Sequence, residues 1–173
     1  MLFQDISYLQ NGTIRQQEAF TVLHQNMMLE KLSAFDPVLV GTIPINIDIE
    51  TSDLDIICCF ENKNIYRDTI VKLFKDFELF SIREREDKEE TVIAGFFTGG
   101  FRVEIFGQNI PCRQQFGYRH LLIEQELLKK YGEIFRQQII ALKKKGYKTE
   151  PAFAQVLKLE GDPYQALLQL EIG

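Results

Sequence analysis

Two carboxylates one residue apart, Asp53 and Asp55, constrain this sequence more than any other feature. They open the apolar run that continues through residues 56–60 and has the composition of a strand. Side chains alternate along a strand, so both carboxylates point to one face, with attachment points roughly 6.5 to 7 Å apart. Such a pair repels unless a cation or a basic side chain lies between the charges. A divalent metal site is therefore the first hypothesis.

Two further features support this hypothesis. Gly41 and Thr42 follow a short predicted strand at residues 38–40, and such a glycine-hydroxyl turn suits a phosphate chain. Glu104 is a single acid among the apolar residues of the segment 101–106, so it is predicted as the third metal ligand. Arg102 lies two residues away on the same face, and a simple ion pair with Glu104 is the alternative.

Together these residues resemble the polymerase-beta-type nucleotidyltransferase superfamily. The match reads Gly41-Thr42, Asp53-x-Asp55 and Glu104, and it covers roughly residues 13–107. The sequence looks most similar to small bacterial members built around one minimal catalytic domain. It departs from the commoner pattern in having Thr for Ser, Glu for Asp, and no recognisable acceptor-binding domain.

The resemblance implies specific roles. Asp53, Asp55 and Glu104 are the catalytic acids and would hold one or two Mg²⁺ ions, which lie about 3.5 to 4 Å apart in two-metal sites. Gly41 and Thr42 would contact the terminal phosphates of a nucleoside triphosphate (NTP). We place Ser52, directly before the acid pair, in the same nucleotide-binding set.

A polar cluster at the start of a later predicted helix supplies two weaker candidates. Arg119 is predicted to clamp a phosphate, because a guanidinium can bind phosphate oxygens with two hydrogen bonds. His120 is able to exchange protons near neutral pH. The alternative is that the cluster satisfies backbone groups at a helix start and packs on the sheet. His24 lies in a helical stripe and is interpreted as structural.

Periodicity predicts an α+β fold. A long amphipathic helix is expected from Thr13 to Leu32, capped by Thr13, and another at about residues 63–77. Strands are expected at 38–40, 52–60, 79–85, 91–98 and 101–106, with a tight hairpin at Gly99-Gly100. The sheet should be mixed but mostly antiparallel, with helices packed on one face and the acids on the other face or at the edge.

The pattern becomes helical after Gly107, with predicted helices at 118–131, 133–145 and about 150–159, and a last helix starting at Asp162-Pro163. We therefore divide the chain into a nucleotidyltransferase-like core at 1–112 and a helical C-terminal segment at 113–173 that packs on it. Residues 113–148 hold nine Lys and Arg against three Asp and Glu. This basic segment could face a polyanionic acceptor, although a solvated helix face is the simpler interpretation, and Lys143–Lys145 fit a helix carboxyl end.

Composition bounds the remaining possibilities. The 173 residues, 45% of them hydrophobic, are enough for one cored domain. Three cysteines without metal-ligand spacing favour reduced thiols and a cytoplasmic location. No stretch has the length of a membrane span, and no signal peptide is expected at the amino end.

Three functional classes follow. The first is a magnesium-dependent enzyme that moves a nucleoside monophosphate (NMP) group from an NTP to a small molecule, protein or RNA acceptor. The second is a catalytically silent module of the same fold that acts with a protein partner. The third, a glycosyltransferase using Asp-x-Asp, ranks last because only about 50 residues precede the acid pair, too few for the nucleotide domain such enzymes need.

Overall fold

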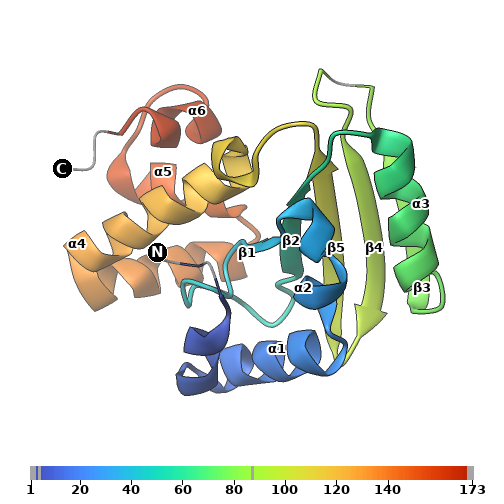
Figure 1. Ribbon diagram of the computed structural model, residues 1–173. Helices are drawn as coiled ribbons and strands as arrows, with labels where there is room; N and C mark the ends of the chain where they lie inside the picture. The colour runs from blue at the N-terminus through green and yellow to red at the C-terminus, as the bar shows by residue number, and fades with distance from the viewer. Residues whose placement is uncertain (1–2, 4, 87, 171–173) are drawn as a thin grey trace.

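A computed structural model describes residues 3, 5–86 and 88–170. It confirms the α+β prediction, because a mixed five-stranded sheet is combined with helices at both ends of the chain (Figure 1). The strands follow the spatial order β1-β2-β5-β4-β3. They are β1 (Val38–Val40), β2 (Leu54–Cys59), β3 (Glu78–Glu84), β4 (Val92–Thr98) and β5 (Phe101–Gln108).

The pairing directions explain why the sheet is mixed. β2 pairs with β5 in parallel, whereas β1–β2, β3–β4 and β4–β5 are antiparallel. The consecutive strands β3, β4 and β5 thus form the predicted antiparallel meander. Gly99 and Gly100 make the β4–β5 turn with φ of +55° and +79°, a conformation that favours glycine.

The first helix is shorter than predicted. α1 (Ile14–Gln25) begins at Thr13, whose side chain accepts a hydrogen bond from the Gln16 backbone N–H while the Gln16 side chain accepts one from Thr13. The prediction that this helix continues to Leu32 is wrong. Asn26 donates its side-chain amide to the Val22 carbonyl at the helix end, and Met27 has φ of 51° before α2 (Met28–Lys31) begins.

The remaining helices are close to their predicted places. They are α3 (Lys63–Phe74), α4 (Phe116–Lys144), α5 (Thr149–Leu157) and α6 (Pro163–Leu168), with short 3-10 turns at Ser7–Asn11, Ser33–Phe35 and Cys112–Gln114. Gly132, with φ of 74° and ψ of −161°, divides α4 where two helices were predicted. Asp162 caps α6 by accepting from the Gln165 N–H at 3.0 Å. Within the described residues, no helix has both the length and the apolar character needed to cross a membrane.

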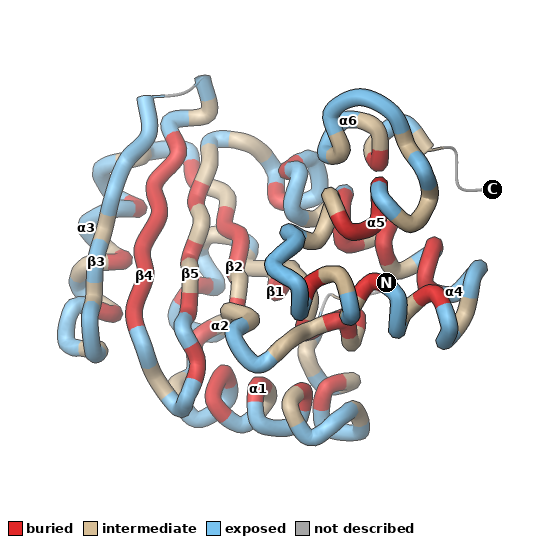
Figure 2. Tube along the Cα trace, turned by 180° about the vertical axis from the view of Figure 1, so that it is seen from behind, coloured by how far each residue is buried: buried red, intermediate tan, exposed pale blue. Residues whose placement is uncertain are grey.

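Two hydrophobic cores lie on opposite faces of the sheet. Leu54 and Ile56 point into the larger core, which α1, α2 and α3 cover. Ile57 and Val40 point into the second core, which α4, α5 and α6 cover over the β1–β2 side. β2 is therefore buried on both faces, as its apolar run predicts. Figure 2 shows that the second face remains uncovered over β3, β4 and β5.

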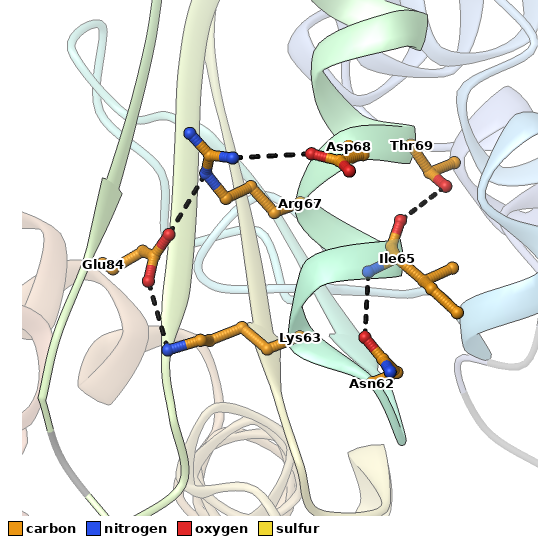
Figure 3. Close-up of polar contacts among 7 residues, drawn as sticks. All are labelled: Asn62, Lys63, Ile65, Arg67, Asp68, Thr69 and Glu84. Carbon is orange, nitrogen blue, oxygen red and sulfur yellow. Dashed lines mark hydrogen bonds and ion pairs between the residues drawn. The ribbon is translucent and has the colours of Figure 1, made fainter.

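α3 is fixed to β3 by charges as well as by its apolar stripe. Figure 3 shows Glu84 of β3 between two cations of α3, with Lys63 Nζ at 3.2 Å and Arg67 Nε at 3.1 Å. Asn62 caps the helix by accepting from the Ile65 N–H at 3.1 Å. These ion pairs lie at the far edge of the sheet from β1, so the charges of β2 and β5 do not take part in them.

The β4–β5 turn offers a matched test of this packing. A Cβ at Gly99 would lie 2.3 Å from Val22 Cγ2, whereas a Cβ at Gly100 would meet nothing within 4 Å. Both positions carry the backbone penalty, but only Gly99 adds a clash with α1. We expect Gly99→Ala to lower the free energy of unfolding by about 2 to 4 kcal/mol and Gly100→Ala by about 1 kcal/mol in urea titrations. Equal losses would contradict this packing.

Candidate active site

The parallel pairing of β2 and β5 brings the three predicted acids together. Asp55 lies opposite Glu104 in this register, and Asp53 precedes β2 by one residue on the same side. One carboxylate oxygen from each of the three lies within 4.8 Å of the others. All three side chains are partly buried. The structure therefore places Asp53, Asp55 and Glu104 in one cluster, which we call the acidic triad.

The triad has the donor chemistry of a hard divalent cation. Mg²⁺ prefers six oxygen ligands at about 2.0 to 2.1 Å, so ligands across the ion are about 4.2 Å apart. The triad oxygens, at most 4.8 Å apart, need only a small approach to share one ion. Three carboxylates also exclude a soft-metal preference, which requires thiolates or imidazoles. The residues present thus fit one divalent cation.

Gly41 is required for the position of Asp55. It follows β1, whose last residue Val40 pairs with Asp55, and it has φ of +80°. A Cβ at Gly41 would lie 2.4 Å from Asp55 Oδ2, so the absence of a side chain lets the carboxylate sit against the turn. The turn and the triad therefore form one contiguous site.

The two hydroxyl residues of the predicted nucleotide-binding set contact each other. Thr42 Oγ1 lies 3.3 Å from Ser52 Oγ, and Ser52 Oγ accepts a hydrogen bond from the Ile49 N–H at 2.9 Å. Ser52 thereby closes the loop between β1 and β2. Thr42 faces the cleft described below, whereas Ser52 is not among the residues that line it.

Long side chains from distant helices hold this loop in place. Arg136 of α4 donates to the Asn46 carbonyl at 2.9 Å, and Lys143 of α4 donates to the Ile47 carbonyl at 2.8 Å. Gln16 of α1 donates to the Ile43 carbonyl at 2.8 Å. These side chains supply the partners that buried backbone carbonyls need outside regular structure. Sequence reasoning missed these contacts, because nothing in the local pattern links the loop to residues about 90 positions later.

Lys143 also corrects one interpretation of the basic segment. Lys144 and Lys145 are exposed, as a solvated helix end predicts, but Lys143 is only 6% exposed. Burial lowers the pKa of Lys143 to about 8, although the nearby acids oppose this shift, first Glu124 and then Asp48 and Asp55. A buried ammonium therefore lies in the electrostatic field of the triad.

Burial and mutual repulsion shape the charge of the triad. Burial, followed by the charges of the neighbouring carboxylates Asp53 and Glu104, raises the pKa of Asp55 to about 7. Burial also raises the pKa of Asp53, while the Arg102 guanidinium opposes the rise. Near neutral pH the cation-free triad thus holds a proton on Asp55 in a sizeable fraction of molecules, and a bound cation would displace it.

Two arginines approach the triad from the open face of the sheet. Arg102 lies 3.3 Å from Glu104 Oε1 and 3.8 Å from Asp53 Oδ2, and Arg83 lies 3.6 Å from Glu104 Oε1. The ion pair that the sequence offered as an alternative for Glu104 is therefore formed. Both arginine side chains are about half exposed, so they can swing into solvent at low cost. Among the described residues, Asp55 forms no such pair.

A cleft of about 560 Å³ opens beside the triad, between the sheet and the C-terminal helices. One end contains Gly41, Thr42, Asp55 and Glu104. The remaining lining comes mainly from β5, α4 and α5, and it includes Phe106, Gln108, Gln114, Gln115, Phe116, Gly117, His120, Leu121, Glu124, Thr149 and Glu150. This volume is in the range of small-ligand sites.

The structure does not bring Arg119 into the cleft. Its side chain is exposed on α4, with the guanidinium 5.9 Å from the centre of the Phe116 ring. His120 does line the cleft, but both ring nitrogens have neighbours: Nε2 lies 3.0 Å from the Tyr164 carbonyl and Nδ1 lies 3.5 Å from Glu150. These contacts link α4 to α5 and α6, which agrees with the packing alternative for this cluster.

Sequence reasoning missed the acids on the helical wall of the cleft. Glu124 of α4 is only 4% exposed, and Glu150 of α5 is partly buried. A signal was present, because Gly117, His120, Leu121 and Glu124 follow the i, i+3, i+4, i+7 spacing of one helix face. A histidine and a glutamate in an otherwise apolar stripe mark that face as more than core packing.

Comparison with known proteins identifies the family and the fold. A family model described as "Domain of unknown function (DUF4269)" matches residues 21–170. No curated protein matches the sequence significantly.

Several solved structures are similar in fold. A Cid1 poly(U) polymerase with bound MgGTP has a TM-score of 0.58 at 11% identity, over 80% of this chain and 46% of that one. The GLD-2/RNP-8 complex has a TM-score of 0.55 at 15% identity, over 88% of this chain and 61% of that one. A cytoplasmic RNA terminal U-transferase has a TM-score of 0.53 at 13% identity, over 75% of this chain and 38% of that one. The chain thus has a polymerase-beta-type nucleotidyltransferase fold and spans less than two thirds of each of these structures.

The turn geometry predicts that Gly41→Ala displaces the Asp55 carboxylate. We expect this variant to weaken Mg²⁺ binding at least tenfold, because the added methyl group occupies the space of Asp55 Oδ2. Gly146→Ala is the matched control, since Gly146 has φ of +94° but nothing lies within 4 Å of an added Cβ. Isothermal titration measures the Mg²⁺ affinity of both variants. Equal effects would assign the loss to backbone strain alone.

The raised pKa of Asp55 predicts that the cation-free protein loses stability as pH rises. The unfolded chain loses this proton near pH 3.8 and the folded chain near pH 7, so folding takes up a proton between these values. The contribution of Asp55 to the free energy of unfolding therefore falls as pH rises from about 4 to about 7. Asp55→Asn should match wild type near pH 4 and exceed its free energy of unfolding by about 2 to 4 kcal/mol at pH 8.

Urea unfolding with a chelator at several pH values measures this difference. Asp76→Asn, at an exposed position after α3, is the control and should leave the pH dependence of wild type unchanged. A wild-type protein that gains stability over Asp55→Asn with rising pH would contradict the assignment.

Proposed function

The chain belongs to the family described as DUF4269, and we propose that it is a magnesium-dependent nucleotidyltransferase that moves an NMP group from an NTP to an acceptor. One observation carries the proposal: the triad oxygens lie within 4.8 Å of one another beside the Gly41–Thr42 turn, in a nucleotidyltransferase fold. The structures of similar fold include a cytoplasmic RNA terminal U-transferase and a poly(U) polymerase with bound MgGTP. These substrates support the class of reaction proposed here.

Different residues of this chain would bind the metal and the phosphates. Asp53, Asp55 and Glu104 would hold Mg²⁺, with room for a second ion as part of the proposal. The Gly41–Thr42 turn would bind the terminal phosphates, with Ser52 holding the loop behind it. Magnesium would supply charge stabilisation for the leaving pyrophosphate and would acidify the acceptor hydroxyl. The acceptor oxygen bonds to the α-phosphorus, the bond to the β-phosphate oxygen breaks, and the hydroxyl proton leaves to solvent.

The acceptor and the setting are also part of the proposal. The acceptor is a small molecule, a protein or an RNA, and the exposed basic residues of α4 favour a polyanion. Arg119 lies outside the cleft, so a phosphate contact from it would be made with the acceptor. The three cysteines are free thiols, which supports a cytoplasmic location.

The test combines binding and turnover. Wild type is incubated with Mg²⁺ and each α-labelled NTP, with short RNA oligonucleotides and with the protein itself as acceptors, and both pyrophosphate release and acceptor labelling are measured. Asp53→Asn should lose at least about 100-fold in rate, because a metal ligand supplies several kcal/mol of transition-state stabilisation. The exposed Asp76→Asn variant should keep the wild-type rate. Failure of wild type to bind either Mg²⁺ or an NTP would sink the proposal.

A second candidate is the catalytically silent module. It is favoured by the arginine contacts, because Arg102 and Arg83 already neutralise Glu104 and Arg102 also reaches Asp53. In this case nucleotide would bind without pyrophosphate release, and the protein would act through a partner. One similar structure is a two-protein complex, GLD-2 with RNP-8. Turnover that appears only after adding a co-purified partner would place this chain in a composite enzyme.

A further inference from the structure

A nearly buried carboxyl lies on the helical wall of the cleft. Glu124 of α4 is 4% exposed and lines the cleft. Within the part of the chain that the structure describes, its carboxyl makes neither a hydrogen bond nor an ion pair. Burying such a group costs free energy unless something satisfies it. Because Glu124 lines the cleft, a bound ligand can supply that hydrogen bond.

A buried amide at the start of the same helix also has an acceptor without a donor. Gln115 is 2% exposed, and its Nε2 donates to the carbonyls of Cys58 at 2.8 Å and Ile110 at 3.0 Å. Because both of these partners are acceptors, the amide cannot be turned around. Its Oε1 is left buried without a hydrogen bond. Among the described residues, neither Gln115 Oε1 nor the Glu124 carboxyl has a hydrogen-bond donor, but Gln115 Oε1 is enclosed, so Glu124 is the acceptor that a ligand in the cleft can reach.

The groups around these acceptors do not satisfy them. His120 is engaged with the Tyr164 carbonyl and Glu150. The charge of Lys143 acts on Glu124, but the one described hydrogen bond of this ammonium goes to the Ile47 carbonyl. Burial, followed by the Glu150 carboxyl, raises the pKa of Glu124 well above its ordinary value. With or without its proton, Glu124 keeps an oxygen able to accept a hydrogen bond.

The position of this wall relative to the triad selects the part of a nucleotide that meets it. If the phosphates bind at Gly41, Thr42 and Asp55, the ribose and base extend along the rest of the cleft, past the rings of Phe106 and Phe116. Adenine, cytosine and guanine each have an exocyclic amino group that donates hydrogen bonds. Uracil has carbonyl oxygens at both exocyclic positions instead, and its base donates only through the ring N3–H, so it has no exocyclic donor for Glu124.

We propose that Glu124 on this wall selects nucleotides with an amino-bearing base over uridine nucleotides by accepting a hydrogen bond from the exocyclic amine. This inference rests on the proposed function, because it uses the phosphate site to orient the nucleotide. It sets the chain apart from the uridylyl transferases to which its fold is similar. An unpaired acceptor in the pocket discriminates strongly, since the wrong ligand leaves it unsatisfied.

Affinities of the full chain for Mg²⁺ complexes of ATP, CTP, GTP and UTP test the inference by isothermal titration. Wild type should bind at least one amino-bearing nucleotide about tenfold or more tightly than UTP. Glu124→Met, which removes the acceptor at similar length, should abolish this preference. Glu124→Gln keeps an acceptor but adds an N–H donor, so it should tighten UTP binding relative to wild type. Glu126→Gln, an exposed neighbour paired with Lys129, should change neither.

A stability measurement separates a ligand-binding role from a structural one. Without nucleotide, Glu124→Met should raise the melting temperature, because it removes a carboxyl whose burial is unfavourable. A lower melting temperature would show that Glu124 stabilises the fold and would overturn the inference. Equal affinity of wild type for all four NTPs, or a preference kept by Glu124→Met, would overturn it while leaving the proposed function intact. No affinity for any Mg·NTP would instead overturn the proposed function on which it rests.

Discussion

The parallel pairing of β2 with β5 is the constraint on which the site depends. It sets Asp55 opposite Glu104, and a register shift of one residue would turn Glu104 to the opposite face, toward α1 and α3. The register is held by apolar residues on that opposite face, where Ile56 pairs with Ile105 inside the larger core. Hydrophobic burial thus fixes two carboxylates side by side despite their repulsion.

The free energy lost to this repulsion is offset by charges of two kinds. On the open face, Arg102 and Arg83 contact Glu104 through exposed side chains, which a cation can displace. On the inner side, Lys143 is buried and hydrogen-bonded to the loop, so its charge is fixed. The exposed arginines Arg102 and Arg83 lie on the solvent side of the triad, whereas the buried Lys143 holds the loop between β1 and β2. Such a division suits a site that stays folded whether or not a cation is bound.

The sequence was sufficient for features that are encoded locally. The alternation around Asp53 and Asp55, the glycine hairpin at Gly99-Gly100 and the cap at Thr13 each depend on neighbours a few residues apart. The break of α4 at Gly132 belongs to the same class. These elements predicted the α+β architecture and the three acids that the structure gathers.

Features that depend on distant contacts were not predictable in this way. No local pattern states that β5 inserts between β2 and β4, because strand order is decided by the burial of whole faces. Arg136 and Lys143 resemble solvated helix cations until the fold brings them to the loop carbonyls. The predicted helix from Thr13 was too long because its apolar spacing continues past Met27, where the backbone leaves the right-handed helical region.

Through these long-range contacts the C-terminal helices take part in forming the site. The division of the chain at residue 112 stays a prediction, but α4 contributes to the site in two ways. Its second half donates hydrogen bonds from Arg136 and Lys143 to the loop behind the Gly41–Thr42 turn. Its first half lines the cleft from Gly117 to Glu124. The sheet therefore supplies the acids, and the helices supply both the support of the turn and the wall that a bound molecule would meet. A site assembled in this way couples the packing of the second core to the geometry of the triad.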